Sequence, residues 1–251
     1  MLEFKKLAIV AAIGASIIGS STAQADVSYN LSASSANNND AGPWSGAAPT
    51  TYIGNMPVTW FATIDQNASY VVSTADAISK GAASSYVIET LNNKWNPANS
   101  WGNALDFGLI DLQSASNLTI TVQADGSTFT PGFTLFSGWD TSPTSSKHGS
   151  WNVALPAVPV NPRGTSGLTY AGQASTTIAG GVATYTFSGL EAGKYSLWIG
   201  GNGTGSTAAG TQKYIANITS APVPVPGAVW LFGSAMAGLV GFGRRKTALS
   251  A

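Results

Sequence analysis

The sequence predicts an all-β body, an antiparallel β-sandwich or jelly roll, flanked by an N-terminal signal helix and a C-terminal transmembrane helix. Short runs rich in β-branched and aromatic residues recur along the chain, and turn-forming residues bound them. No repeat of twenty to fifty residues is present, which disfavours a solenoid or a propeller. The chain has no cysteine, so its stability must come from packing and backbone pairing rather than from disulfides.

The first 25 residues have the composition of an export signal. Lys5 and Lys6 precede a short apolar stretch, and small residues follow it up to Ala23-Gln24-Ala25. A basic start, a short apolar run and a final A-x-A site are typical of a secretory signal peptide, so we expect cleavage after Ala25. The alternative is an uncleaved anchor helix, for which the apolar run is short.

Residues 26–57 are rich in Ser, Ala and Asn and are expected to form an extended lead-in, after which a β-sandwich domain spans residues 58–220. A short helix is expected within 75–83. Prolines between 143 and 162 exclude a central strand from the loop that ends near Gly167. The expected strands lie at 58–64, 69–74, 85–90, 104–113, 118–124, 134–136, 168–170, 183–187, 195–199 and 214–219.

The run from Tyr185 to Leu197 predicts two strands around a turn. Leu190 is expected to tuck beneath the turn, and Gly193 to take a backbone angle that other residues avoid. This Leu-x-x-Gly-x-Tyr run resembles the hairpin of bacterial β-sandwich modules, including pre-peptidase C-terminal-like domains, and the likeness covers about residues 118–219.

Residues 221–251 form a separate C-terminal segment. Val223-Pro224-Val225-Pro226 is a stiff, extended linker. An uncharged apolar run over 227–243 is just long enough to cross a bilayer, and Arg244-Arg245-Lys246 follows it. Because basic clusters stay on the cytoplasmic side, the rest of the chain is expected to face outward.

This order of features resembles the PEP-CTERM sorting signal: Val-Pro-x-Pro, then an apolar helix containing Trp230-Leu231-Phe232-Gly233-Ser234, then a terminal pair of arginines. The usual Glu between the prolines is absent here. The resemblance implies transient insertion into the inner membrane, cleavage near the prolines by an exosortase, and release to the cell surface or extracellular matrix of a Gram-negative bacterium that makes exopolysaccharide. The alternative is an ordinary tail anchor with the same topology.

The charge pattern excludes nucleic-acid binding. Charged residues are only 9% of the chain, and the formal net charge is zero. Five basic residues and Glu3 lie in the two terminal segments, which leaves ten acids against six bases in the body. A body with this acidic excess lacks the clustered Lys and Arg that nucleic acids require.

No catalytic, metal or cofactor site is expected. His148 is the only histidine, and no Gly-x-Ser-x-Gly elbow accompanies it. The carboxylates are scattered, with Asp106 and Asp111 on opposite sides of one expected strand. Asp125 and Asp140 could offer oxygen ligands to calcium, but without an Asp-x-Asp-x-Asp-Gly loop they are expected to be solvated turn residues.

One loop has the residue types of a carbohydrate site. Trp rings stack on sugar faces, and neighbouring polar groups bind hydroxyls. The alternative is that the two Trp side chains close the end of the sandwich as core. The candidate residues are Trp139, Asp140, His148, Trp151 and Asn152.

Taken together, these features predict a non-enzymatic, exported and exosortase-processed protein of the cell surface or matrix. We expect it to support biofilm or floc formation by association with exopolysaccharide. A carbohydrate-binding module acting through the Trp139–Trp151 loop is the first alternative, and a secreted hydrolase is the second.

Overall fold

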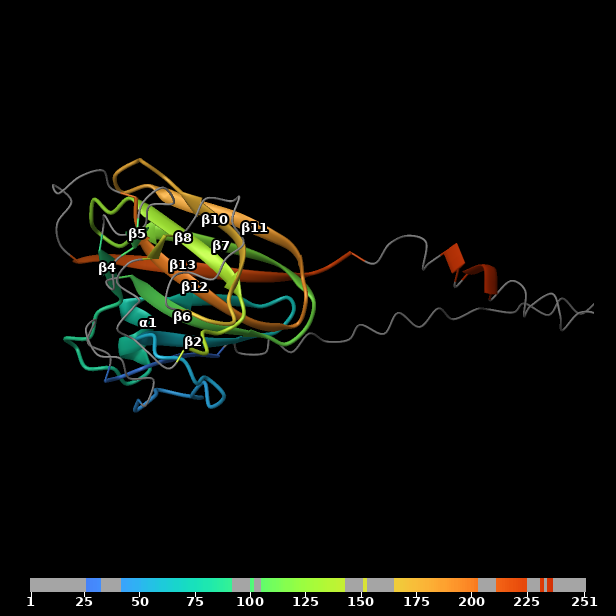
Figure 1. Cartoon of the computed structure of the whole chain (residues 1–251). Helices are drawn as coiled ribbons and strands as arrows, with labels where there is room; N and C mark the ends of the chain where they lie inside the picture. Colours follow the sequence, from blue (N-terminus) through green and yellow to red (C-terminus); the bar gives the residue numbers. More distant parts are fainter. Residues whose placement is uncertain are drawn as a thin grey trace, which may run out of the picture.

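The computed structural model describes residues 26–32, 42–91, 100–101, 105–142, 151–152, 165–202, 211–224, 231–232 and 234–236. Within these residues, two β-sheets stack face to face as a sandwich (Figure 1). The prediction of an all-β sandwich is confirmed for this part of the chain.

The first sheet, here called the six-stranded sheet after its described strands, has the order β1-β2-β6-β12-β8-β10. Neighbouring strands run antiparallel, except that β2 and β6 are parallel. The prediction of a purely antiparallel sandwich is therefore wrong at this pair, because the chain visits the other sheet between β2 and β6. The strands are β1 (Asp26–Tyr29), β2 (Val58–Ile64), β6 (Asp106–Leu112), β8 (Pro131–Ser137), β10 (Thr169–Ser175) and β12 (Gly193–Gly201).

The second sheet, here called the five-stranded sheet, has the described order β11-β7-β13-β3, and β4 pairs with the other end of β13. After β3 comes the helix α1 (Thr74–Ser79), inside the predicted interval; the Ser73 side chain caps it by accepting a hydrogen bond from the Asp76 N–H. The strands are β3 (Ser69–Val72), β4 (Glu89–Leu91), β7 (Ser116–Ala124), β11 (Val182–Leu190) and β13 (Thr211–Pro222), and β5 (Ser100–Trp101) pairs separately with β9 (Trp151–Asn152).

The sandwich begins earlier than predicted. β1 lies in the stretch expected to be an extended lead-in, but it pairs along its whole length with β2. Val27 and Tyr29 of β1 are buried in the main core, and the Tyr29 Oη donates a hydrogen bond to Asp76 of α1 over 2.6 Å. Alternating apolar positions in only four residues are too short a pattern to identify a strand from sequence.

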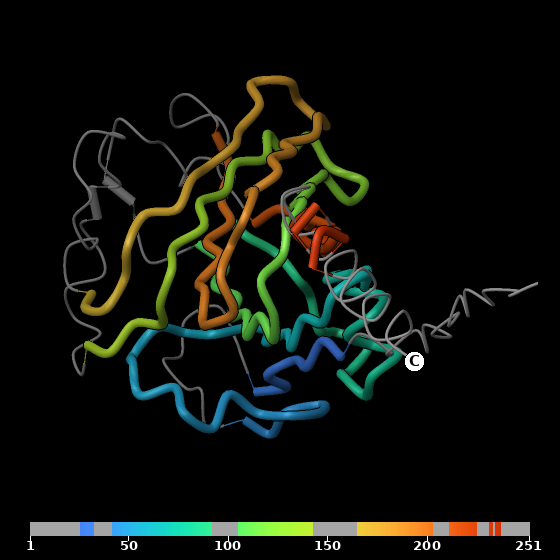
Figure 2. Tube along the Cα trace, turned by 90° about the vertical axis from the view of Figure 1, so that its right-hand side faces the viewer, coloured from blue at the N-terminus to red at the C-terminus, as the bar shows by residue number. Residues whose placement is uncertain are grey.

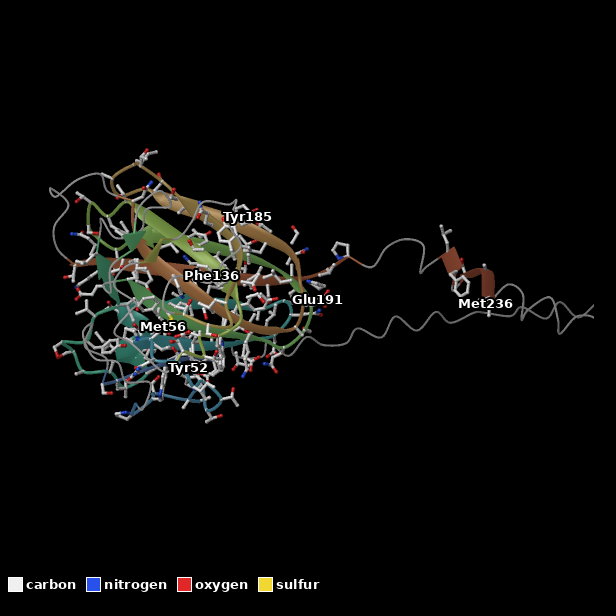
Figure 3. The ribbon with its side chains drawn as sticks, in the orientation of Figure 1. Tyr52, Met56, Phe136, Tyr185, Glu191 and Met236 are labelled. Carbon is white, nitrogen blue, oxygen red and sulfur yellow. The ribbon has the colours of Figure 1, made fainter. Side chains whose placement is uncertain are left out.

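The six-stranded sheet is buried on both faces. Its inner face packs against the five-stranded sheet, with Trp60, Ile110 and Leu197 in the shared core. Its outer face forms a second core beneath residues 42–57, the blue segment along the lower side of Figure 2. Figure 3 places Tyr52 and Met56 of this segment on the side of the molecule away from Tyr185 of β11. The second core consists of Tyr52, Met56, Val58, Phe61, Leu105, Phe107, Leu109, Phe136, Trp139, Leu168 and Trp198.

The Leu-x-x-Gly-x-Tyr run is a corner and not a hairpin. β11 pairs with β7, whereas β12 pairs with β6 and β8, so the chain crosses from one sheet to the other between Leu190 and Gly193. The Tyr195 Oη donates to the Glu191 carbonyl over 2.8 Å, which is the geometry of a tyrosine corner in sandwich folds. The predicted positive φ of Gly193 is confirmed at 152°, and Leu190 packs partly buried against the core.

The predicted terminal signals lie mostly outside the described residues. This holds for residues 1–25 with Ala23 and Ala25, and for Val225, Pro226, Trp230, Arg244 and Arg245. Val223 and Pro224 directly follow β13, and residues 231–232 and 234–236 have helical backbone. No helix in the described part of the chain is long and apolar enough to cross a bilayer, so the spanning helix stays a prediction.

Candidate functional site

Trp139 was predicted to stack on a sugar, but its side chain is only 6% exposed. Its Nε1 donates to two backbone carbonyls of the six-stranded sheet, those of Ile110 (3.1 Å) and Tyr195 (3.0 Å). The carbonyls belong to adjacent strands, so the indole bridges β6 and β12 from outside the sheet. A ring held in this way is a core residue, which confirms the alternative stated for Trp139 and excludes an exposed sugar platform at this position.

The faces of the Trp139 ring are also occupied. Tyr52 and Phe61 meet it edge to face, with ring centroids 6.2 and 5.8 Å away. The Lys194 Nζ lies 4.3 Å from the ring centroid, within the range of a cation–π interaction, and donates to Thr51 Oγ1 over 2.5 Å. Tyr52 and Thr51 come from the covering segment 42–57, which a local sequence pattern does not place on this loop.

Asp140 is a buried residue that joins two chain segments by hydrogen bonds, rather than a solvated turn residue or a sugar ligand. Its side chain is 1% exposed. One carboxylate oxygen accepts hydrogen bonds from the backbone N–H groups of Ser142 (3.0 Å) and Ser166 (2.9 Å), and so ties together chain segments 26 residues apart. The prediction of a solvated aspartate at this position is wrong.

The remaining predicted loop residues are only partly described. His148 lies outside the described residues. Trp151 and Asn152 form β9, where Trp151 is paired with Trp101 of β5. The side chains of Trp151 and Asn152 also lie outside what the structure describes, so the role of these three residues in a sugar site stays a prediction.

A buried carboxyl lies at one end of the main core. Asp106, at the start of β6, is 3% exposed and accepts hydrogen bonds from Thr59 Oγ1, Tyr214 Oη and the Phe107 N–H (2.9 Å). The Tyr214 Oη in turn accepts from the Trp60 Nε1 over 3.2 Å. These bonds join β2 and β6 of the six-stranded sheet to β13 of the five-stranded sheet.

Burial changes the pH at which the Asp106 carboxyl ionises. It raises the pKa of Asp106 to about 6, against the opposing effect of the hydrogen bonds from Thr59, Tyr214 and Phe107. Burial and the neighbouring carboxyl also raise the pKa of Tyr214. Among the described residues no three His, Cys, Asp or Glu side chains gather as metal ligands. The hydrogen bonds of this enclosed carboxyl join the two sheets across the core.

The outer side of the five-stranded sheet carries an ordered polar surface that the loop-centred prediction missed. We call it the hydroxyl face. Strand registers align its residues in two ranks across β11, β7, β13 and β3. All of these side chains are exposed or half-exposed, and the residues between them on β7, β13 and β3 are buried in the core, whereas Tyr185 on the edge strand β11 is exposed. The ranks are Thr184, Thr121, Asn217 and Val71, and Thr186, Thr119, Thr219 and Ser69.

Neighbouring threonines on this face are paired. The Oγ1 atoms of Thr119 and Thr186 are 2.8 Å apart, and those of Thr121 and Thr184 are 3.1 Å apart. A third, flanking rank of Val182, Gln123 and Ile215 is also uncharged. The sequence signal was the alternation Asn117-x-Thr119-x-Thr121-x-Gln123, which by itself does not reveal the neighbouring strands.

A comparison with protein-family models and with curated proteins gives no match. Two solved structures have some similarity to this chain. CorA, a surface-associated copper-binding protein of Methylomicrobium album BG8, is 13% identical with a TM-score of 0.40, over 65% of this chain and 98% of CorA. The secreted protein MopE of Methylococcus capsulatus, in which an oxidized tryptophan facilitates copper binding, is 12% identical with a TM-score of 0.35, over 80% of this chain and 95% of MopE. Similarity at this level does not indicate a ligand for this chain.

Proposed function

We propose that this protein is a non-enzymatic, exported sandwich of the bacterial cell surface or extracellular matrix, which supports cell aggregation by association with exopolysaccharide. In this proposal an exosortase processes the C-terminal segment after transient insertion in the inner membrane. The observation that supports it best is the extent of the folded body. Every described strand lies within residues 26–222, after the predicted signal cleavage and before Pro224, near which the C-terminal cleavage is predicted; β13 extends to Pro222, two residues into the predicted C-terminal segment. Cleavage at both predicted points would leave every described strand intact.

The two ends of the body also lie at one end of the sandwich. Asp26 is paired with Thr63, which is paired with Asp111 near the end of β6. The next strand, β7, starts at Ser116, opposite Pro222. Figures 1 and 3 show β13 leaving the sandwich at the end where Glu191 lies. A membrane attachment there would leave the hydroxyl face pointing sideways, free to contact material outside the cell.

The described residues beyond the linker have the surface chemistry of a membrane-seeking segment. Leu231 and Phe232 are 72% and 70% exposed, and Met236 is also exposed. Moving apolar side chains with this exposure from water into a bilayer lowers the free energy of the system. This supports, for residues 227–243, the predicted role of a temporary membrane anchor.

Intact-mass analysis of the extracellular protein tests the processing. The expected species starts at Asp26 and lacks everything beyond the prolines near Pro224. Replacing Arg244 and Arg245 by Ala is expected to leave unprocessed chain in the membrane fraction, and Lys213→Ala in the body serves as the control for loss of a basic residue. Full-length chain that still contains both arginines, recovered outside the cell, would contradict the sorting proposal.

Deletion of the gene tests the role in the matrix. We expect reduced cell aggregation or reduced matrix retention, with growth and polysaccharide synthesis unchanged. Complementation with the intact gene restores aggregation under this proposal. A deletion strain that aggregates like its parent would exclude the matrix role, whatever the processing experiment shows.

A further inference from the structure

We propose that the hydroxyl face is a binding surface for a neutral polysaccharide, held by hydrogen bonds to its ordered threonine hydroxyls. This deepens the proposed function, on which it rests, by assigning the polysaccharide contact to the five-stranded sheet instead of the Trp139 loop. The two sheets differ in a way that favours this assignment. The second core and segment 42–57 cover the outer side of the six-stranded sheet, whereas the outer side of the five-stranded sheet presents polar side chains to water.

The geometry of the face is that of a regular array. Adjacent strands are about 4.8 Å apart, and residues two apart on a strand are about 7 Å apart. Four aligned strands therefore present hydroxyl and amide groups over roughly 14 Å across the sheet. A sugar polymer has hydroxyls at a comparable, repeating spacing, so consecutive sugar units meet consecutive strands.

The hydroxyls are already oriented before a ligand arrives. In each threonine pair one O–H bonds to its neighbour, which leaves the second O–H and the remaining lone pairs available to a ligand. Threonine has a stiff, β-branched side chain, and pairing restricts it further. A preorganised array loses little conformational entropy on binding, which favours many weak hydrogen bonds made together.

The lack of charged side chains on the hydroxyl face favours a neutral polymer as its ligand. None of the residues in the two ranks or in the flanking rank is charged, and the nearest charge along β13 is Lys213, which lies opposite Glu89 in the strand register of β13 and β4. A polyanion would require Lys or Arg on the face, and a polycation would require Asp or Glu. The acidic excess of the body further disfavours a polyanion.

Affinity electrophoresis and pull-down of the full chain in detergent test the proposal independently of processing. The probes are soluble dextran and insoluble cellulose and curdlan as neutral polymers, and alginate as a polyanion. The key variant is Thr119→Val with Thr121→Val, which removes two central hydroxyls while keeping the β-branched shape. The matched control is Thr63→Val with Thr169→Val, two strand threonines of the six-stranded sheet.

We expect the parent to bind at least one neutral polymer and not alginate, and the key variant to bind at least fivefold more weakly with an unchanged urea midpoint. The control variant is expected to bind like the parent. If the double variant fails to fold, Thr184→Val on the edge strand β11 takes its place. Three results would overturn the proposal: no binding to any neutral polymer, equal binding by the folded variant, or a variant-sensitive self-association in sedimentation velocity without polysaccharide binding. None of them alters the processing result, which tests the proposed function separately.

Discussion

The buried carboxyl of Asp106 makes the stability of the sandwich depend on pH. Below about pH 4 the carboxyl is protonated in the folded and unfolded states alike, so its ionisation has no effect. Between about pH 4 and 6 the unfolded chain ionises while the folded chain holds its proton, and the free energy of unfolding falls as pH rises. Above about pH 6 both states are ionised and the loss is complete. A pKa raised from 3.8 to about 6 corresponds to a loss of roughly 3 kcal/mol.

Asp106→Asn removes this ionisation and keeps the shape of the side chain. The amide oxygen accepts from Thr59 and the Phe107 N–H, and the amide nitrogen donates to the Tyr214 Oη. We therefore expect the free energy of unfolding of the variant, relative to the parent, to rise by roughly 3 kcal/mol between pH 4 and 7.

Urea unfolding followed by tryptophan fluorescence, at intervals from pH 4 to pH 8, measures this difference. Asp111→Asn, on the same strand at a half-exposed position, controls for the loss of a carboxylate. A difference between Asp106→Asn and the parent that stays constant across this range would refute the reasoning. So would a variant whose stability relative to the parent falls as pH rises.

Three further substitutions test the packing. Trp139→Ala is expected to lower the free energy of unfolding by about 3–5 kcal/mol, measured by urea unfolding, because it empties a core position; a fully stable variant that loses only sugar binding would contradict its core role. Tyr195→Phe removes the corner hydrogen bond to Glu191 and should lower stability by about 1 kcal/mol in the same assay, while an unchanged midpoint would show that the corner contributes nothing. Gly108→Ala places a Cβ against the buried Trp60 ring and should lower the thermal midpoint, with a loss of about 1–3 kcal/mol; an unchanged midpoint would contradict the tight packing of this ring on β6.

Local pattern was a good guide to the strands themselves. The predicted 58–64 coincides with β2, and each of the other predicted strands overlaps an observed one, because side-chain alternation and turn residues act over a few positions. The same alternation does not indicate which of the two sheets a strand joins. Residues 185–197 show the pattern of two strands and a turn whether the second strand joins the first in one sheet or crosses to the other, so the corner was predicted as a hairpin.

The candidate site depended more on tertiary contacts. A tryptophan in a polar loop looks the same in sequence whether it is exposed or covered, and Trp139 is covered because segment 42–57, distant along the chain, folds over it. Asp106 was visible only as one of several scattered acids, and its raised pKa arises from enclosure between two sheets. The alternating threonines of β7 were visible too, but the hydroxyl face exists only because strand registers bring β11, β13 and β3 beside them.

The sequence by itself determined the all-β class, the positions of most strands and the absence of disulfides, because each follows from residue type or from spacing within a few residues. Only the tertiary structure decided which sheet each strand joins, which aromatic rings are core and which polar side chains form a continuous surface. These properties depend on pairing between strands up to about 150 residues apart, such as β3 with β13, and no local pattern contains that register.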